Sequence, residues 1–170
     1  AVTLISRALE LQPDLAEAHN NLGLALQLLG RAQSAKASYQ KAIDLNERYA
    51  DAHCNMGNIL RELGKLDDAV TSYQTALSLN PEYALAYSNL GITFQELGKL
   101  EEALTCFEKA ISLQPELAEA QHNHALSLQA LGNFEEAINS YRRAISIRPN
   151  YVEAHCNLGI ALNNLGKLEE

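Results

Sequence analysis

The 170-residue sequence contains no tryptophan, one methionine and few aromatic residues, which make up 6% of the chain. It also lacks a long hydrophobic run. No apolar stretch approaches the roughly 20 residues that a membrane-spanning helix needs, and the N-terminus has no signal-type apolar region. We therefore expect no membrane insertion. Hydrophobic residues nevertheless make up 47% of the chain, which is sufficient for a folded core.

Basic residues are also scarce. Thirteen Lys and Arg face 21 Asp and Glu, which gives a net charge of −8 at pH 7, and the basic residues are scattered along the chain. Affinity for nucleic acid comes largely from clustered Lys and Arg that displace counterions from the phosphate backbone. The composition therefore predicts no nucleic-acid partner.

The nine glycines and four prolines all follow one 34-residue period. Two glycine series are Gly23, Gly57, Gly91 and Gly159, with Ala125 in the remaining copy, and Gly30, Gly64, Gly98, Gly132 and Gly166. The prolines are Pro13, Pro81, Pro115 and Pro149, and Glu47 takes the missing place. This period is typical of a stacked array of helix-turn-helix units, each of which buries its apolar face against its neighbours.

The segment 50–83 shows how one unit is built. Apolar residues at helical spacing predict a first helix from about 51 to 63, and Gly64 ends it because glycine adopts the left-handed cap conformation without a Cβ penalty. The recurring Gly57 indicates a close helix crossing, which the aromatic Tyr73 fills. Acidic pairs open the second helix, where the helix dipole favours them. These pairs are Asp67 and Asp68, Glu101 and Glu102, Glu135 and Glu136, and Glu169 and Glu170.

This pattern of glycine, alanine, aromatic, alanine and proline closely resembles the tetratricopeptide repeat family, and the resemblance covers the whole chain. It implies an all-α fold, a right-handed α-solenoid of stacked helix-turn-helix units. We expect one array over 1–170, with a half repeat at 1–15, full repeats at 16–49, 50–83, 84–117 and 118–151, and a partial repeat at 152–170. His124, Ala125 and Glu47 depart from the family pattern.

One repeat position, two residues before the first-series glycine, holds asparagine in every copy. We call Asn21, Asn55, Asn89, Asn123 and Asn157 the asparagine row. A carboxamide offers an acceptor and two donors, so it can pair with the backbone of an extended peptide. Successive repeats are stacked about 10 Å apart, which is roughly the length of three residues of an extended peptide. The row resembles the asparagine array of O-linked N-acetylglucosamine transferases, and bacterial tetratricopeptide scaffolds are similar. Hydrogen bonding that fixes the stacking of adjacent repeats is the alternative role.

In a tetratricopeptide superhelix the first helix of each unit lines a concave groove, so the resemblance places the asparagine row in that groove. Amide and acidic side chains are expected around it. The further candidate groove residues are Gln27, Asn58, Arg61, Gln95 and Gln129. Acids at Glu17, Asp51, Glu119 and Glu153 favour a neutral or basic peptide, although they are equally suited to interact with the helix dipole. A chaperone-tail clamp needs Lys and Arg in the groove, where the chain has Asn20, Cys54, Ser88, His122 and Cys156 instead.

The five histidines and three cysteines do not predict chemistry. His19, His53 and His155 share one repeat position, so they lie roughly 10 Å or more apart, whereas zinc ligands lie about 2 Å from one ion. We expect them to be half-buried packing residues. Cys54, Cys106 and Cys156 form no CxxC pair and are read as free thiols in the cytoplasm. We therefore expect no metal site, no cofactor and no catalytic activity in this segment.

The sequence thus predicts a protein-interaction scaffold that binds extended peptide along a concave groove. The alternative is a structural module that assembles through its own repeats. Residues 1–11 read as a second helix without its first helix, and 152–165 as a first helix without its second. We therefore expect a part of a longer array, in which copies can associate head to tail, and a catalytic domain such as a glycosyltransferase elsewhere in the parent protein is compatible with this resemblance.

Overall fold

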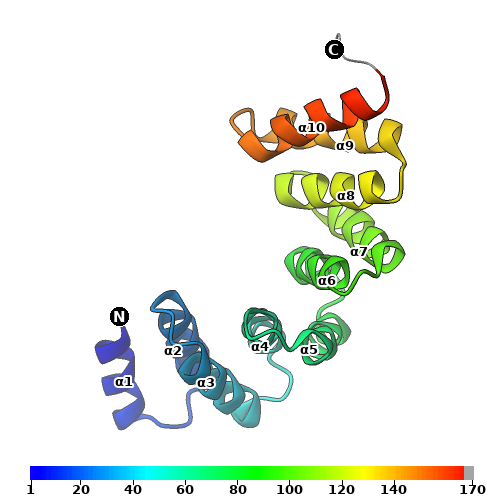
Figure 1. Ribbon diagram of the computed structural model, residues 1–170. Helices are drawn as coiled ribbons and strands as arrows, with labels where there is room; N and C mark the ends of the chain where they lie inside the picture. The colour runs from blue at the N-terminus through cyan, green and yellow to red at the C-terminus, as the bar shows by residue number, and fades with distance from the viewer. Residues whose placement is uncertain (167–170) are drawn as a thin grey trace. The chain divides into compact units, whose positions relative to one another are not determined.

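The computed structural model describes residues 1–166, and within this range it contains ten α-helices and no strand (Figure 1). Helices α2 to α10 are 13 or 14 residues long, and α1 has ten residues. The helices are α1 (Val2–Leu11), α2 (Ala16–Leu28), α3 (Ala32–Leu45), α4 (Ala50–Glu62), α5 (Leu66–Leu79), α6 (Ala84–Glu96), α7 (Leu100–Leu113), α8 (Ala118–Ala130), α9 (Phe134–Ile147) and α10 (Val152–Asn164).

The helices pack as the pairs that the repeat pattern predicts, α2 with α3, α4 with α5, α6 with α7 and α8 with α9. The all-α helix-turn-helix architecture is therefore confirmed. The chain forms two compact units, unit 1 over residues 1–82 and unit 2 over residues 83–170. The division falls within one residue of the boundary expected between repeats 50–83 and 84–117. A single functional array over 1–170 remains a prediction, and Glu169 and Glu170 lie outside the described residues.

The second-series glycines end the first helices as expected. Gly30, Gly64, Gly98, Gly132 and Gly166 have positive φ angles, between 68° and 84°. Beyond Gly64 the backbone N–H of Lys65 donates to the carbonyl of Leu60 at 2.9 Å, which satisfies a carbonyl at the helix end. This turn directs the chain back along the first helix, so that each pair of helices is antiparallel.

The first-series glycines lie where an aromatic ring crosses the first helix. A Cβ atom on Gly57 would come within 2.6 Å of the Tyr73 ring, and one on Gly91 within 2.7 Å of the Phe107 ring. Both rings are fully buried. A side chain at these glycines would therefore displace the aromatic residue around which each repeat packs. In repeat 118–151 the close crossing holds Ala125, and there Tyr141 remains fully buried.

First helices and second helices occupy different sides of each unit. Within residues 1–166, α2 contacts α4 in unit 1, and α8 contacts both α6 and α10 in unit 2. No such contact joins α3 to α5 or α7 to α9 in the described residues. Because only the first helices approach one another, they lie on the inner, more closely spaced side of each unit.

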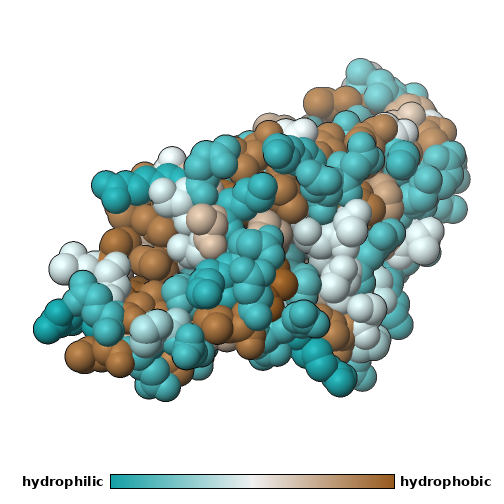
Figure 2. All heavy atoms as spheres, turned by 90° about the horizontal axis from the view of Figure 1, so that it is seen from below, coloured by the Kyte–Doolittle hydropathy of each residue, from teal (hydrophilic) through white to brown (hydrophobic). Residues whose placement is uncertain are grey.

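The surface combines hydrophilic and hydrophobic residues, and brown hydrophobic spheres lie among teal hydrophilic ones on the face shown in Figure 2. Several large aliphatic side chains are exposed, including Leu28 at 89%, Leu85 at 52% and Ile160 at 50%. Along residues 1–166, no helix has the length and apolar composition needed to cross a membrane.

Candidate peptide-binding surface

The asparagine row lies on equivalent turns of the five first helices. Asn21 on α2 is exposed, and Asn55 on α4 is half-buried. In unit 2, Asn89 on α6, Asn123 on α8 and Asn157 on α10 are all half-buried. None of the five is buried inside a helix pair, because the alanine and aromatic positions fill that space.

Two members of the row connect successive first helices. The Asn55 side-chain amide donates to Asn20 Oδ1 at 2.9 Å in unit 1. In unit 2, Asn157 Nδ2 lies 3.0 Å from His122 Nε2, and the amide donates to the ring nitrogen. Asn20 and His122 occupy the same repeat position, immediately before an asparagine of the row. The row therefore has a stacking role at these two junctions.

Stacking uses only part of the hydrogen-bonding capacity of each carboxamide. Asn55 commits one N–H to Asn20, while a carboxamide carries a second N–H and an oxygen that accepts two hydrogen bonds. The stacking bond also fixes the side-chain rotamer, so these groups are oriented before any ligand arrives. Stacking and peptide binding are thus compatible functions of one residue.

Two of the predicted groove amides, Gln27 and Gln129, accept a hydrogen bond from the tyrosine of their own repeat. The Tyr39 hydroxyl donates to Gln27 Oε1 at 2.9 Å, and the Tyr141 hydroxyl donates to Gln129 Oε1 at 3.0 Å. Burial raises the pKa of both tyrosines to about 12, with a further contribution from Glu62 at Tyr39, so both remain donors at neutral pH.

In repeat 50–83 the glutamine position holds the half-buried Arg61, and the Tyr73 hydroxyl donates to Asn58 Oδ1 at 2.7 Å instead. In repeat 84–117 the aromatic residue is Phe107, which has no hydroxyl group. There the Gln95 amide reaches α8 and donates to the Asn123 carbonyl at 3.0 Å and to Ser127 Oγ at 2.9 Å. The amides outside the asparagine row therefore mainly hold the repeats together.

A second row of residues, which was not among the predicted site residues, lies on the same face of the first helices. Three residues beyond each member of the asparagine row, four of five copies carry an aliphatic residue. We call Leu24, Ile92, Leu126 and Ile160 the aliphatic row; Asn58 takes the remaining place. Leu24 is 39% exposed and Ile160 50% exposed, while Ile92 and Leu126 are half-buried. A spacing of three residues on a helix places both rows on one face, so the periodicity alone contained this signal.

The acids of the surface lie in the first turns of their helices. Glu17, Asp51, Glu119 and Glu153 are all exposed. Glu119 forms an ion pair with Arg148, which lowers the pKa of that carboxyl group. The Arg148 guanidinium also lies 4.8 Å from the centre of the Tyr151 ring. One acid is therefore paired within the chain.

The histidines have structural partners. His19, His53 and His155 each donate from Nε2 to the backbone carbonyl six residues earlier, at 2.9 Å. The expectation that all three are half-buried is wrong for His155, which is exposed. In the described residues α10 contacts only α8 and α9, whereas α4, which carries the half-buried His53, contacts α2, α3 and α5. His122 is buried between Tyr141 and Tyr151, and burial lowers its pKa.

Metal-ligating and nucleophilic side chains do not cluster together within residues 1–166. No cluster of three or more His, Cys, Asp or Glu there is arranged to hold a metal ion. Burial, with a smaller contribution from Glu102, raises the pKa of the Cys106 thiol to about 11, so it stays protonated at neutral pH. Cys54 is also buried, and Cys156 is exposed.

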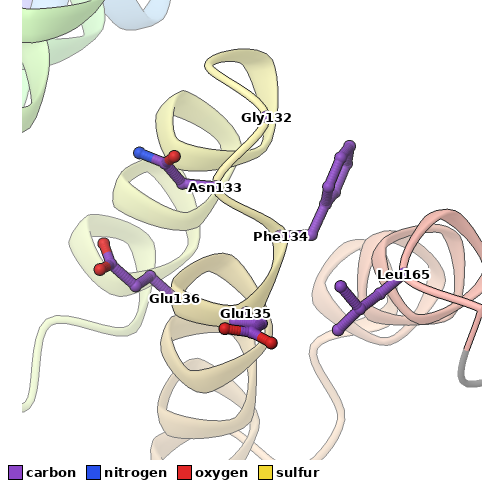
Figure 3. Close-up of a pocket in the computed structure, with 6 residues that line it drawn as sticks. All are labelled: Gly132, Asn133, Phe134, Glu135, Glu136 and Leu165. Atoms are coloured by element: carbon purple, nitrogen blue, oxygen red, sulfur yellow. The ribbon is translucent and has the colours of Figure 1, made fainter.

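A small hollow lies at the turn between α8 and α9 (Figure 3). Phe134 and Leu165 form its apolar wall on the side of α10, and Asn133 and Glu136 point to the opposite side. Glu135 lies between them at the start of α9. The described residues that line the hollow include neither a nucleophile nor a basic group.

Comparisons with known proteins agree with this architecture. Sequence profiles described as tetratricopeptide repeat match residues 16–49, 84–117 and 38–71, and a TPR repeat profile matches residues 57–98 and 127–166. No curated protein sequence matches the chain.

Solved structures show the same fold. A crystal structure of MamA is 24% identical over 89% of this chain and 89% of its own, with a TM-score of 0.79. MamA from Desulfovibrio magneticus RS-1 is 20% identical over 91% of this chain and 87% of its own, with a TM-score of 0.82. YrrB, described as a TPR protein with an unusual peptide-binding site, is 22% identical over 98% of this chain and 86% of its own, with a TM-score of 0.80. The chain is a helical solenoid that belongs to the tetratricopeptide repeat family.

Proposed function

We propose that this protein-interaction scaffold binds extended peptide segments through the inner, first-helix face of each unit. The observation that carries the proposal is the asparagine row, whose carboxamides lie on equivalent turns. Asn55 and Asn157 each use one N–H for stacking, and a carboxamide carries a further N–H and an acceptor oxygen. Backbone recognition of this kind places few demands on the ligand's side chains. A free thiol at the exposed Cys156 suits a reducing compartment such as the cytoplasm.

The charge of the surface favours neutral or basic ligands. Glu17, Asp51 and Glu153 are exposed on the first helices, and the only groove arginine in the prediction, Arg61, is half-buried. Because exposed charges are screened over about 8–10 Å at physiological salt, the preference for a basic over an acidic peptide should decline as salt rises. A salt-independent preference for acidic peptides would refute this part of the proposal.

The test replaces Asn55, Asn89 and Asn123 together with alanine and measures binding to an unstructured, lysine-containing peptide by fluorescence anisotropy. We expect at least tenfold weaker binding, because each lost peptide hydrogen bond contributes about 1 kcal/mol. The matched control is Asn139→Ala, which removes an exposed asparagine from the second helix α9. Equal affinity for all three proteins, each with a native circular dichroism spectrum, would leave the row with its stacking role alone.

The second candidate function is association of copies of the chain through α10 and α1. A Cβ atom at Gly159 on α10 would meet nothing within 4 Å, although the equivalent Gly23, Gly57 and Gly91 each face an aromatic ring. On α1, Leu4 and Leu11 are 77% and 78% exposed, and Ile5 occupies the aromatic position of a second helix. Sedimentation equilibrium checks this: Leu4→Asp should abolish concentration-dependent association, and a wild-type chain that stays monomeric excludes it.

A further inference from the structure

We infer that the inner face of unit 2 selects peptides that carry an aliphatic side chain at every third residue and adopt the polyproline II conformation. The inference rests on the proposed peptide-binding function and specifies the ligand class for one part of the surface. Its basis is the aliphatic row in unit 2, formed by Ile92 on α6, Leu126 on α8 and Ile160 on α10.

These three side chains are accessible to a ligand. Ile160 is 50% exposed, and Ile92 and Leu126 are half-buried. Leu85 lies on the same face of α6, seven residues before Ile92, and is 52% exposed. Each helix therefore presents an aliphatic group beside its row asparagine, and covering these groups removes apolar surface from water.

The spacing of the row selects the ligand conformation. Because α8 contacts both α6 and α10, the axes of adjacent first helices are roughly 8–10 Å apart. A polyproline II chain has three residues per turn and rises about 3.1 Å per residue, so side chains at i, i+3 and i+6 share one face about 9.3 Å apart. In a β-strand, side chains on one face are about 6.6 Å apart, which does not match the helix spacing.

The asparagine row complements this conformation. Polyproline II has no internal hydrogen bonds, so its backbone N–H and C=O groups are open to other partners. Asn89, Asn123 and Asn157 precede the three aliphatic residues by three positions each, so each ligand turn meets one carboxamide and one aliphatic side chain. Glu153 at the start of α10 is exposed and favours basic residues between the aliphatic ones.

Unit 1 lacks this continuity. Its aliphatic residue is Leu24 on α2, and the equivalent position on α4 is Asn58, which accepts the Tyr73 hydroxyl at 2.7 Å. The row is therefore interrupted in unit 1 by a polar residue that is held by its own repeat. Selection for aliphatic side chains should accordingly depend on unit 2.

Three labelled peptides of eleven residues test the spacing. All contain the same three leucines, four prolines and four lysines, with the leucines at every second, every third or every fourth position. Binding to the full chain is measured by fluorescence anisotropy. We expect the peptide with leucine at every third position to bind about tenfold more tightly than the other two.

Substitutions assign this preference to the row. Ile160→Asn should abolish most of the preference for leucine at every third position, and Leu126→Asn should do the same. Leu126 also packs against the core of unit 2. The more exposed Ile160 is therefore the primary variant. Val152→Asn is the matched control, since Val152 is 67% exposed on α10 but lies off this face. It should leave the preference unchanged.

Equal affinity for the three peptides overturns the spacing rule. If the triple asparagine variant then weakens all three equally, peptide binding itself survives. Binding of none of the three overturns the selection for aliphatic residues, while the alanine test above decides the general function with its own lysine-containing peptide. A loss of preference in Val152→Asn as large as in Ile160→Asn would also contradict the assignment.

Discussion

The two units solve the same stacking problem with different chemistry. In unit 1, Asn55 donates to the carboxamide of Asn20, and in unit 2, Asn157 donates to the imidazole of His122. The donor and its repeat position are identical, and only the acceptor differs. A carboxamide keeps its acceptor at every physiological pH, whereas a histidine nitrogen loses it on protonation. One repeated position can therefore carry a constant link in one unit and a titratable link in the other.

The close crossing shows a second difference between the units. Gly23 and Gly57 in unit 1 both face a tyrosine ring at distances that exclude a Cβ atom. In unit 2, Gly91 does the same, and Ala125 occupies the crossing of the next repeat. The crossing therefore holds glycine in both repeats of unit 1, and glycine in one repeat and alanine in the next in unit 2.

The largest effect should come from breaking that crossing. Gly57→Ala places a methyl group 2.6 Å from the Tyr73 ring, and such overpacking costs about 1–3 kcal/mol. Gly159→Ala introduces no such contact, and it should be neutral or stabilise the chain by up to about 1 kcal/mol through helix propensity. Urea unfolding monitored by circular dichroism measures both. Equal effects at the two glycines would show that the ring contact does not determine the requirement for glycine.

An intermediate effect should come from the tyrosine hydroxyls. Tyr39→Phe in unit 1 and Tyr141→Phe in unit 2 each remove one hydrogen bond to a glutamine oxygen. We expect a loss of about 0.5–1.5 kcal/mol in the free energy of unfolding for each, because the half-buried glutamines recover part of the bond from water. The natural Phe107 shows that the crossing accepts phenylalanine. An unchanged stability in both variants would mean that these bonds contribute nothing net.

The smallest effect should be on the pH dependence of the free energy of unfolding. It distinguishes the units, because only unit 2 has a histidine as the acceptor of the stacking bond described above. Burial lowers the pKa of His122 below its ordinary value of 6.5, while a hydrogen bond with the Asn123 side chain and the charges of Glu153 and Glu119 partly oppose the shift. The unfolded chain therefore takes up a proton first as the pH falls, so stability is full above about pH 7 and declines through the range below 6.5. His122→Asn supplies the acceptor found at Asn20, so it should keep the Asn157 bond and reduce this decline.

His124 is the control for that comparison. Burial lowers its pKa as well, and its Nδ1 lies 3.0 Å from Ser140 Oγ. His124→Leu restores the apolar residue present at Leu90 and Leu158, and the double variant with His122→Asn should show the flattest dependence of unfolding free energy on pH. A His122→Asn protein with the full wild-type pH dependence would show that the Asn157 link does not titrate.

Much of the fold followed from the period alone. The glycine positions fix the helix ends because positive φ excludes most other residues, and the observed angles agree at Gly64 and the four equivalent turns. The period also predicted that the asparagine row lies on equivalent turns of the first helices. It could not identify partners: that Gln129 accepts from Tyr141, or that Asn157 donates to His122, depends on side-chain rotamers and on spacing between repeats. The exposure of His155 likewise depends on what covers α10.

The central claim is that the inner face of the first helices binds extended peptide, and nuclear magnetic resonance tests it most directly. The 15N-labelled chain is titrated with the lysine-containing peptide, and the side-chain NH2 signals of asparagines are followed. The account predicts shifts for Asn21, Asn55, Asn89, Asn123 and Asn157 that saturate together, with little change for Asn139 on α9. Shifts confined to second helices, or saturating binding that leaves the asparagine row unchanged, would contradict it.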